Sequence, residues 1–224
     1  MLTAPWIVEK LWKKHHDNLL MMKLFYPRWL AAYLNGESVE PQMKRACRRW
    51  LWTCSPRRFE NGKWGRKNPN TLFFIPFWKS IYPNMIYINV IRDGRDIAFN
   101  RRMTYINHYN QGLFSTEERE LPEHLRKALF WKRCNEIAQT NVLAADRRYT
   151  ASFEALCSNP TESIVRILNF LNSPLDENKI QEAAKLVKTP ESLGRWKNEK
   201  KSSILEVEEF LGTALTEQGY QPSH

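Results

Sequence analysis

Four charged side chains stand within five positions, Arg92 to Asp96, directly after an apolar run. A guanidinium group presents a planar fork that can bind a phosphate through two hydrogen bonds. The carboxylates can cap a helix or pair with the arginines. The segment is therefore either an anion-binding turn or an ordinary strand-to-helix turn tied by an Arg92–Asp96 ion pair, and the spacing alone leaves both open.

The residues around this turn indicate where it lies in a fold. Residues 85–91 are short, apolar and rich in β-branched side chains, which predicts a parallel strand covered on both faces. A helix should follow to about residue 107, with Asp93 and Asp96 as a pair resembling a capping box. Ligands bind beyond the carboxyl ends of parallel strands, and a helix N-terminus there adds N–H donors that suit phosphate.

The remaining patterns predict a helix-rich α/β fold, with a parallel sheet flanked by helices. A second strand is expected over 148–153. Pro160 should open one helix, and Gly219 should end the last. Helices are expected over residues 5–35, 70–83, 122–143, 159–172, 175–188 and 204–220.

The chain is basic, with a net charge of +10 over 224 residues, and such a charge indicates an anionic partner. Residues 41–69 carry nine Lys or Arg against Glu60 alone, although this stretch could equally be a solvated surface. It has no groove-reading pattern, so we do not expect nucleic acid as the partner. The alternative that is not an enzyme is a basic nucleic-acid-binding protein.

Composition also bears on compartment and metal binding. The mean hydropathy is −0.58, and no run reaches the roughly 18 apolar residues of a membrane span. The N-terminus lacks the order of a secretory signal, so we expect a cytoplasmic protein, unless an anchor preceded Met1. The cysteines at 47, 54, 134 and 157 lack metal-ligand spacing, so no metal site is expected. The sequence does not decide whether Cys47 and Cys54 form a disulfide.

Four segments, in order, resemble the sulfotransferase family, whose donor is 3′-phosphoadenosine 5′-phosphosulfate (PAPS). The sequence "VIRDGRDIAFN" (90–100) resembles the segment that binds the 3′-phosphate. "WGRKNP" (64–69) is similar to the Lys-x-Pro segment near the active site. Residues 149–172 resemble a strand, a Tyr-Glu-x-Leu turn and the next helix, and residues 192–220 are similar to the Gly-Arg-Trp segment and closing helix. We expect a single domain, 1–224, in which the resemblance covers about 60–220 and residues 1–59 form a helical, basic region.

The resemblance implies a P-loop NTPase-like fold and roles for individual residues. Arg92 matches the arginine that clamps the 3′-phosphate, and Asn100 stands where the family has a serine as second ligand. Gly194, Arg195 and Trp196 match a loop that closes over the cofactor and contacts this phosphate.

Other positions carry parts of the family's pattern less completely. Lys67 matches the lysine of Lys-x-Pro and would help to stabilise charge on the transferring sulfuryl group, unless it is one more solvated lysine. Phe153 stands where the family often has tyrosine, so a hydroxyl contact is lost there. We choose no catalytic base from the four candidates Glu9, His15, His16 and His108.

The family's glycine-rich loop, which cradles the 5′-phosphosulfate after the first strand, is not found. None of the eight glycines follows a strand-like run near the N-terminus, and the first is Gly36. We therefore expect an N-terminally truncated version of the fold. Three explanations stay open: an inactive fragment or mis-assigned start of a longer enzyme, a non-catalytic member, or a donor 5′ end bound by Arg101, Arg102 or residues 44–66.

The function implied by the resemblance is transfer of a sulfuryl group from PAPS to a hydroxyl or amine acceptor, which the sequence does not identify. Such a transfer depends on positioning and on stabilising charge in the transition state. The alternative within the family is a non-catalytic protein that binds an anion such as 3′-phosphoadenosine 5′-phosphate (PAP), the product left after transfer.

Overall fold

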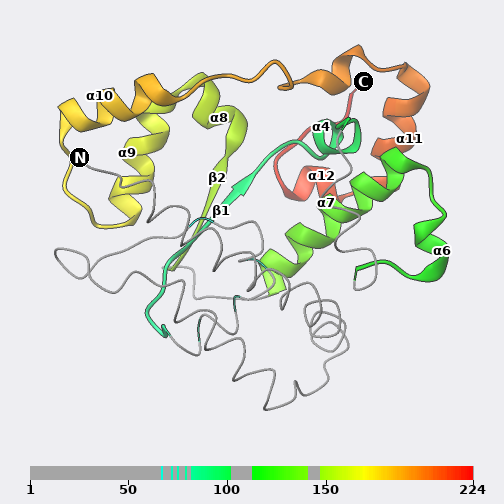
Figure 1. The fold of residues 1–224 in the computed structure, drawn as a ribbon, viewed down its shortest axis with the longest axis horizontal. Coiled ribbons are helices and arrows are strands. Elements are labelled where there is room, and N and C mark those ends of the chain that lie inside the picture. The colour runs from blue at the N-terminus through cyan, green and yellow to red at the C-terminus, as the bar shows by residue number, and fades with distance from the viewer. Residues whose placement is uncertain are drawn as a thin grey trace, which may run out of the picture. The chain divides into compact units, whose positions relative to one another are not determined.

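The computed structural model describes residues 82–101, 113–140 and 147–223, together with Lys67, Leu72, Ile75 and Lys79 (Figure 1). The chain divides into two compact units, Met1–Asn68 with Asn107–Thr116, and Pro69–Ile106 with Glu117–His224. The elements below belong to the second unit, apart from Thr116, and each unit is considered by itself. The expected single domain therefore stays a prediction.

Several expectations fall outside the described residues. They include the helix over 5–35, the cysteines at 47 and 54, the four candidate bases, Arg102, and the basic stretch apart from Lys67. Within the expected helix over 70–83, Ile75 is helical and 1% exposed.

The two predicted strands form a parallel pair. Strand β1 (Tyr87–Ile91) pairs with β2 (Arg148–Ser152), in a register that places Ile91 opposite Ser152 (Figure 1). Because the strands are parallel, the residues that follow each of them begin at the same edge. The expectation that β1 is covered on both faces is wrong at Val90, whose exposed fraction is 57%.

Helices make up most of the rest of the described chain. Pro160 opens its helix as predicted. The short helix directly after β2 was not expected as a separate element. The helices are α4 (Gly94–Ala98), α6 (Thr116–Arg119), α7 (Glu123–Thr140), α8 (Phe153–Ser158), α9 (Pro160–Phe170), α10 (Glu177–Leu186), the 3₁₀ helix η4 (Arg195–Asn198), α11 (Lys201–Leu211) and α12 (Ala214–Glu217).

Helix α4 ends at Ala98, well before the predicted residue 107. The backbone N–H of Asn100 bonds to the carbonyl of Ile97, which tightens the last turn. The buried ammonium group of Lys127, on α7, donates to the Asn100 carbonyl. This contact from another helix lies just beyond the end of α4.

The predicted closing helix over 204–220 is divided into α11 and α12. Gly212 ends α11 with φ 55° and ψ −131°, a conformation that favours glycine. Gly219, at φ 86°, lies after α12 as expected for a helix stop.

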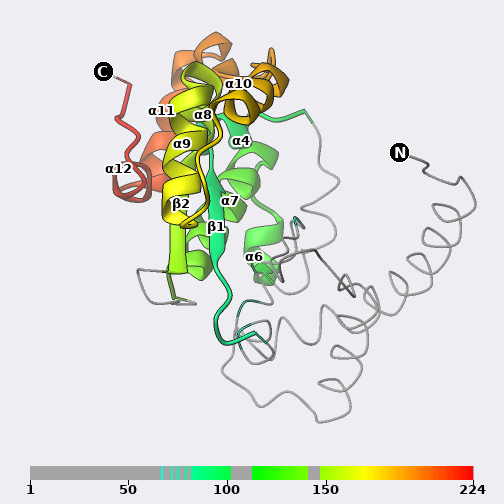
Figure 2. The same cartoon turned by 90° about the vertical axis from the view of Figure 1, so that its left-hand side faces the viewer.

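The core that supports the first turn of α4 lies between β1, α4, α7, α11 and α12. Helix α4 packs against α7 and α11, which also contact each other, while α9 packs against β2 (Figure 2), with the Tyr149 and Phe170 rings 5.2 Å apart. Apolar burial holds these elements together. The buried members of this core are Ile91, Ala98, Leu125, Ala128, Trp131, Val207, Leu211 and Leu215.

Candidate functional site

The turn from β1 into α4 is capped from two directions. Asp93 is the N-cap, and its carboxylate accepts a 2.9 Å hydrogen bond from the backbone N–H of Arg95. The N–H of Asp93 itself donates to Glu154 Oε1, at 2.9 Å. The predicted capping box of Asp93 with Asp96 is therefore wrong. The carboxylate that accepts from the Asp93 N–H belongs to Glu154, which lies in α8 directly after β2, and not to Asp96.

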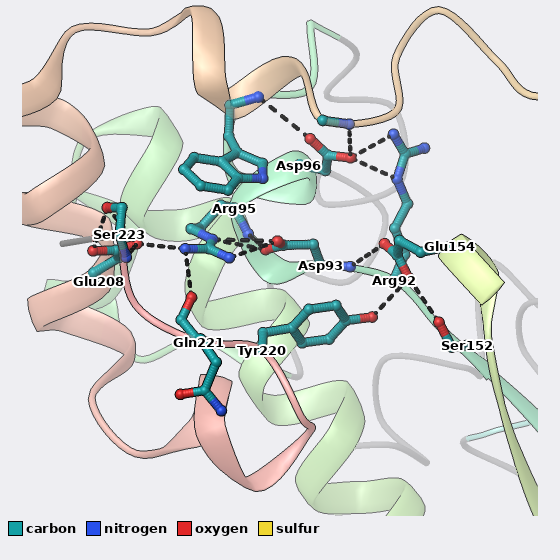
Figure 3. A network of polar contacts seen from close by, with 12 residues as sticks. Arg92, Asp93, Arg95, Asp96, Ser152, Glu154, Glu208, Tyr220, Gln221 and Ser223 are labelled. Carbon is teal, nitrogen blue, oxygen red and sulfur yellow. Dashed lines mark hydrogen bonds and ion pairs between the residues drawn. The ribbon is translucent and has the colours of Figure 1, made fainter. Parts of the chain in front are cut away.

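Asp96 instead joins this turn to a distant loop (Figure 3). Its carboxylate is 2% exposed and accepts from Arg92 Nε and Nη2, at 3.2 and 2.9 Å. The backbone N–H groups of Gly194 and Trp196 donate to it as well, at 2.8 and 3.3 Å. Gly194 has φ 72°, which a residue with a Cβ rarely adopts, so the glycine allows this approach.

Arg92 lies between Asp96 and the loop at Ser192. Its Nη2 donates to the Ser192 carbonyl and, at 3.2 Å, to Ser192 Oγ, and its guanidinium stands 5.2 Å from the centre of the Phe153 ring. The Arg92–Asp96 ion pair that the sequence offered as one alternative is present. The side chain is still 20% exposed, and Nη1 has no hydrogen-bond partner among the described residues.

Arg195 and Asn100 complete the cluster. Arg195 Nη1 donates to Asn100 Oδ1 at 3.1 Å, and Arg195 Nε donates to the Ser192 carbonyl at 3.2 Å. The structure thus brings together five residues singled out from the sequence: Arg92, Asn100, Gly194, Arg195 and Trp196. The sixth, Lys67, is exposed, outside regular secondary structure and in the other compact unit, so its place relative to the cluster is not described.

Arg95, in contrast, is buried and forms ion pairs with carboxylates of the chain itself. It is 4% exposed, pairs with both oxygens of Asp93, and donates to Glu208 Oε1 at 2.5 Å. Its guanidinium also lies 3.8 Å from the centre of the Trp196 ring. Burial works against the charge, but the bonds to Asp93 and Glu208 outweigh it and raise the pKa of Arg95. Arg95 is therefore committed to holding the turn rather than to an external anion.

The guanidinium groups of the site differ in their carboxylate partners. Arg95 is balanced by Asp93 and Glu208, whereas Arg92 shares the single carboxylate of Asp96. Within the described residues, Arg195 bonds to an amide oxygen and a carbonyl, and no ion pair to it is found. Among the described residues, the guanidinium without a carboxylate partner at the carboxyl edge of the strands is therefore that of Arg195, while Glu154, which accepts from the Asp93 N–H, adds a further carboxylate to the turn.

Three contributors to the site were not found from the sequence. Glu154, Ser192 and Lys127 each contact the turn from an element far along the chain. The only local signal was the Tyr-Glu-x-Leu pattern, which drew attention to the segment around Glu154 without suggesting its hydrogen bond. Among the described residues no group of three or more side chains could hold a metal ion, and no helix is long and apolar enough to cross a bilayer.

Comparisons with known proteins bear on this site. The model of the family described as "Sulfotransferase family" matches residues 4–177, which include Arg92 and Asn100 but end before the loop at Ser192–Trp196. The match also reaches back through residues that the sequence motifs had left out. A protein of Caenorhabditis elegans named "Putative protein-tyrosine sulfotransferase" is 28% identical over 117 residues, which are 51% of this chain and 42% of that protein.

The chain thus spans less than half the length of this curated relative. No solved structure matches the chain. The family match covers well over half of the 224 residues and includes the turn on which the site is built. The chain belongs to the sulfotransferase family.

Proposed function

We propose that the cluster at the carboxyl edge of β1 binds the 3′-phosphate of PAPS or PAP. Arg92 and Arg195 are the cationic ligands in this proposal, and Asn100 and the Gly194–Trp196 loop complete the site. The observation that carries it is the pair of guanidinium groups that donate to one carbonyl oxygen, that of Ser192. Two like charges held so close repel each other, and a bound phosphate would offset this repulsion.

The donor atoms available at the cluster suit such a ligand. Arg92 Nη1 and Arg195 Nη2 have no hydrogen-bond partner among the described residues, and the partial exposure of Arg92 leaves it accessible. Charge-assisted hydrogen bonds from guanidinium to phosphate are among the stronger polar contacts in proteins. Asp96 supports the site by holding the Nε edge of Arg92, which leaves the other edge for the ligand.

For the whole protein we propose transfer of a sulfuryl group from PAPS to a hydroxyl or amine acceptor, on a P-loop-like α/β fold. Bound PAPS would supply the activated sulfuryl group, and this chain's part is to hold the nucleotide's 3′-phosphate end. Lys67 is the proposed group that stabilises charge near the transferring group. The printed name of the worm relative makes a tyrosine hydroxyl the first acceptor to test.

The 224-residue chain by itself is proposed to bind PAP without turnover, because its sequence has no glycine-rich loop after an early strand. Such a loop supplies the cluster of backbone N–H groups that a 5′-phosphosulfate needs. A non-catalytic PAP-binding protein is accordingly the second candidate function.

The deciding experiment is a calorimetric titration of the purified chain with PAP, repeated at raised salt and with ATP, which lacks the 3′-phosphate. We expect selective PAP binding that survives salt. The Arg92→Ala variant should lose ten-fold or more in affinity, because a hydrogen bond to a charged group contributes about 1.5–3 kcal/mol. The matched control is Arg166→Ala, which removes an arginine that is 67% exposed and, within the described part of the chain, paired with Glu162 alone. No binding by the native chain, or equal affinity in Arg92→Ala, contradicts the proposal.

A further inference from the structure

The peptide group that joins Arg92 to Asp93 is held at both of its polar atoms. Its carbonyl oxygen, on Arg92, accepts a 2.7 Å hydrogen bond from the indole Nε1 of Trp131, on α7. Its N–H, on Asp93, donates to Glu154 Oε1, at the start of α8. A peptide plane fixed at both atoms cannot rotate, so these two contacts set the direction in which the Arg92 side chain leaves the backbone.

Tyr220, which follows α12, contacts both groups that hold this peptide. Its hydroxyl donates to Glu154 Oε2 at 3.0 Å, and its ring meets the Trp131 ring edge-on, with centroids 6.4 Å apart and planes at 66°. Burial, and then the neighbouring Glu154 carboxylate, raise the pKa of Tyr220, so its hydroxyl stays protonated and can donate. Ser152 Oγ also donates to Glu154 Oε2, at 3.1 Å, which leaves this carboxylate little freedom.

The segment that carries Tyr220 is tied to the same turn by a second set of contacts (Figure 3). Arg95 Nη1 donates to the carbonyl of Gln221 at 3.0 Å. The backbone N–H and hydroxyl of Ser223 donate to Glu208, at 2.9 and 2.8 Å, and Glu208 in turn pairs with Arg95. Residues 220–223 are therefore part of one hydrogen-bonded network with the Arg92 turn.

We propose that Tyr220 is a positioning residue for Arg92. It orients Glu154 and Trp131, and through them it fixes the peptide from which the Arg92 guanidinium extends. Tyr220 thereby sets how strongly the site prefers a nucleotide with a 3′-phosphate. The ligand named here rests on the proposed function, whereas the positioning of the Arg92–Asp93 peptide is a property of the chain itself.

The test compares Tyr220→Phe with Tyr149→Phe. The first variant keeps the ring against Trp131 but removes the hydroxyl that donates to Glu154. The second removes a hydroxyl that makes no hydrogen bond within the described residues, on a ring that packs against Phe170. Tyr149 therefore controls for the loss of a hydroxyl as such.

The first measurement needs no ligand. The amide proton of Asp93 is followed by hydrogen exchange in the NMR spectrum, because this N–H reports directly on the bond to Glu154. We expect exchange at Asp93 to be about five-fold faster in Tyr220→Phe, with the β1 and β2 amides unchanged, because a net hydrogen bond of ordinary strength is lost beside it. Tyr149→Phe should leave Asp93 unchanged. Exchange that becomes faster at all amides alike overturns the proposal, and so does an unchanged exchange rate at Asp93.

The second measurement is the affinity for PAP against that for adenosine 5′-phosphate, which lacks the 3′-phosphate. We expect Tyr220→Phe to weaken PAP binding about five-fold and to leave adenosine 5′-phosphate unchanged. Equal weakening of both nucleotides means a general loss of structure and overturns the positioning role. If the native chain does not bind PAP, the proposed function fails, while exchange at Asp93 still decides whether Tyr220 positions the turn.

A double mutant tests whether the effect passes through Glu154. Glu154→Gln should speed exchange at Asp93, and adding Tyr220→Phe to it should have little further effect, because both changes act on one hydrogen-bonded chain. Additive effects of the two changes would mean that Tyr220 acts on the turn by another route, and would overturn the proposal.

Discussion

Arg92 and Arg195 donate to the same carbonyl oxygen, that of Ser192, although they lie in turns far apart along the chain. Local sequence places each arginine only in its own turn. Asp96 brings the two turns together, because it accepts from Arg92 and from the backbone of the loop that contains Arg195. The pairing of the two cations is therefore a tertiary property, and each can be tested separately.

We expect Arg195→Ala to weaken PAP binding about ten-fold, the loss that follows when one charged hydrogen bond to phosphate is removed. Arg195→Lys should restore only part of the affinity, because an ammonium group cannot bond Asn100 and Ser192 with the planar geometry seen here. The measurement is calorimetry with PAP at two salt concentrations. Full affinity in Arg195→Ala would remove this arginine from the site.

The sequence was sufficient for the elements that local patterns specify. The β-branched run before Arg92 predicted β1, and Pro160 predicted the start of α9. Spacing alone could not distinguish the roles of Arg92 and Arg95, since both follow β1 within one short turn, and only the family resemblance selected Arg92. Burial and distant partners separate them, because Arg95 is 4% exposed and paired with Glu208, while Arg92 keeps an open edge.

Two of the errors in the prediction concern contacts from distant elements. Asp93 and Asp96 have capping-box spacing, but Glu154, at the start of α8, accepts from the Asp93 N–H, and the Asp96 carboxylate accepts from Arg92 and Gly194. Helix α4 ends at Ala98, and Lys127 from α7 bonds to the Asn100 carbonyl just beyond this end. In both places a side chain from a distant element bonds to the backbone of the turn, which a reading of neighbouring residues cannot foresee.

The free energy of unfolding should fall in acid because Glu208 becomes protonated. Burial alone would raise the pKa of this carboxyl, but the hydrogen bonds from Ser223 and the pairing with Arg95 outweigh burial and lower it. A lowered folded-state pKa means that the stabilisation is fully present above the ordinary value of 4.5 and is lost as the pH falls through the folded-state pKa. Urea unfolding should therefore show that the free energy of unfolding falls more steeply with decreasing pH in the native chain than in Glu208→Gln. Glu209→Gln, an exposed neighbour on α11, is the control and should match the native chain.

Gly94 should not tolerate a side chain. A Cβ at this position would lie 2.8 Å from two ring carbons of Trp131, which is closer than side chains pack. Replacing glycine by alanine inside a helix ordinarily stabilises it, so the sign of the effect is informative. We expect Gly94→Ala to lower the free energy of unfolding by about 1–3 kcal/mol, the usual cost of overpacking. Urea titration measures it, and a gain in stability would show that Trp131 can move away.

The docking of the loop at Ser192–Trp196 should depend on the charge of Asp96. Its carboxylate is nearly inaccessible and accepts from Arg92, Gly194 and Trp196 together. An amide of the same shape keeps one oxygen acceptor but presents an N–H₂ group where a second acceptor is needed, and it leaves Arg92 without a counter-charge. Asp96→Asn should therefore lower the free energy of unfolding by about 3 kcal/mol.

The matched control for this change is Asp176→Asn, at the exposed N-cap of α10, where asparagine caps as well as aspartate does. Limited proteolysis separates loop release from general unfolding, because a freed loop is cut at Arg195 or Lys197 while α7 stays protected. If Asp96→Asn and Asp176→Asn have equal stability and equal cleavage, the carboxylate does not hold the loop. Arg92 and Arg195 would then owe their proximity to Ser192 alone.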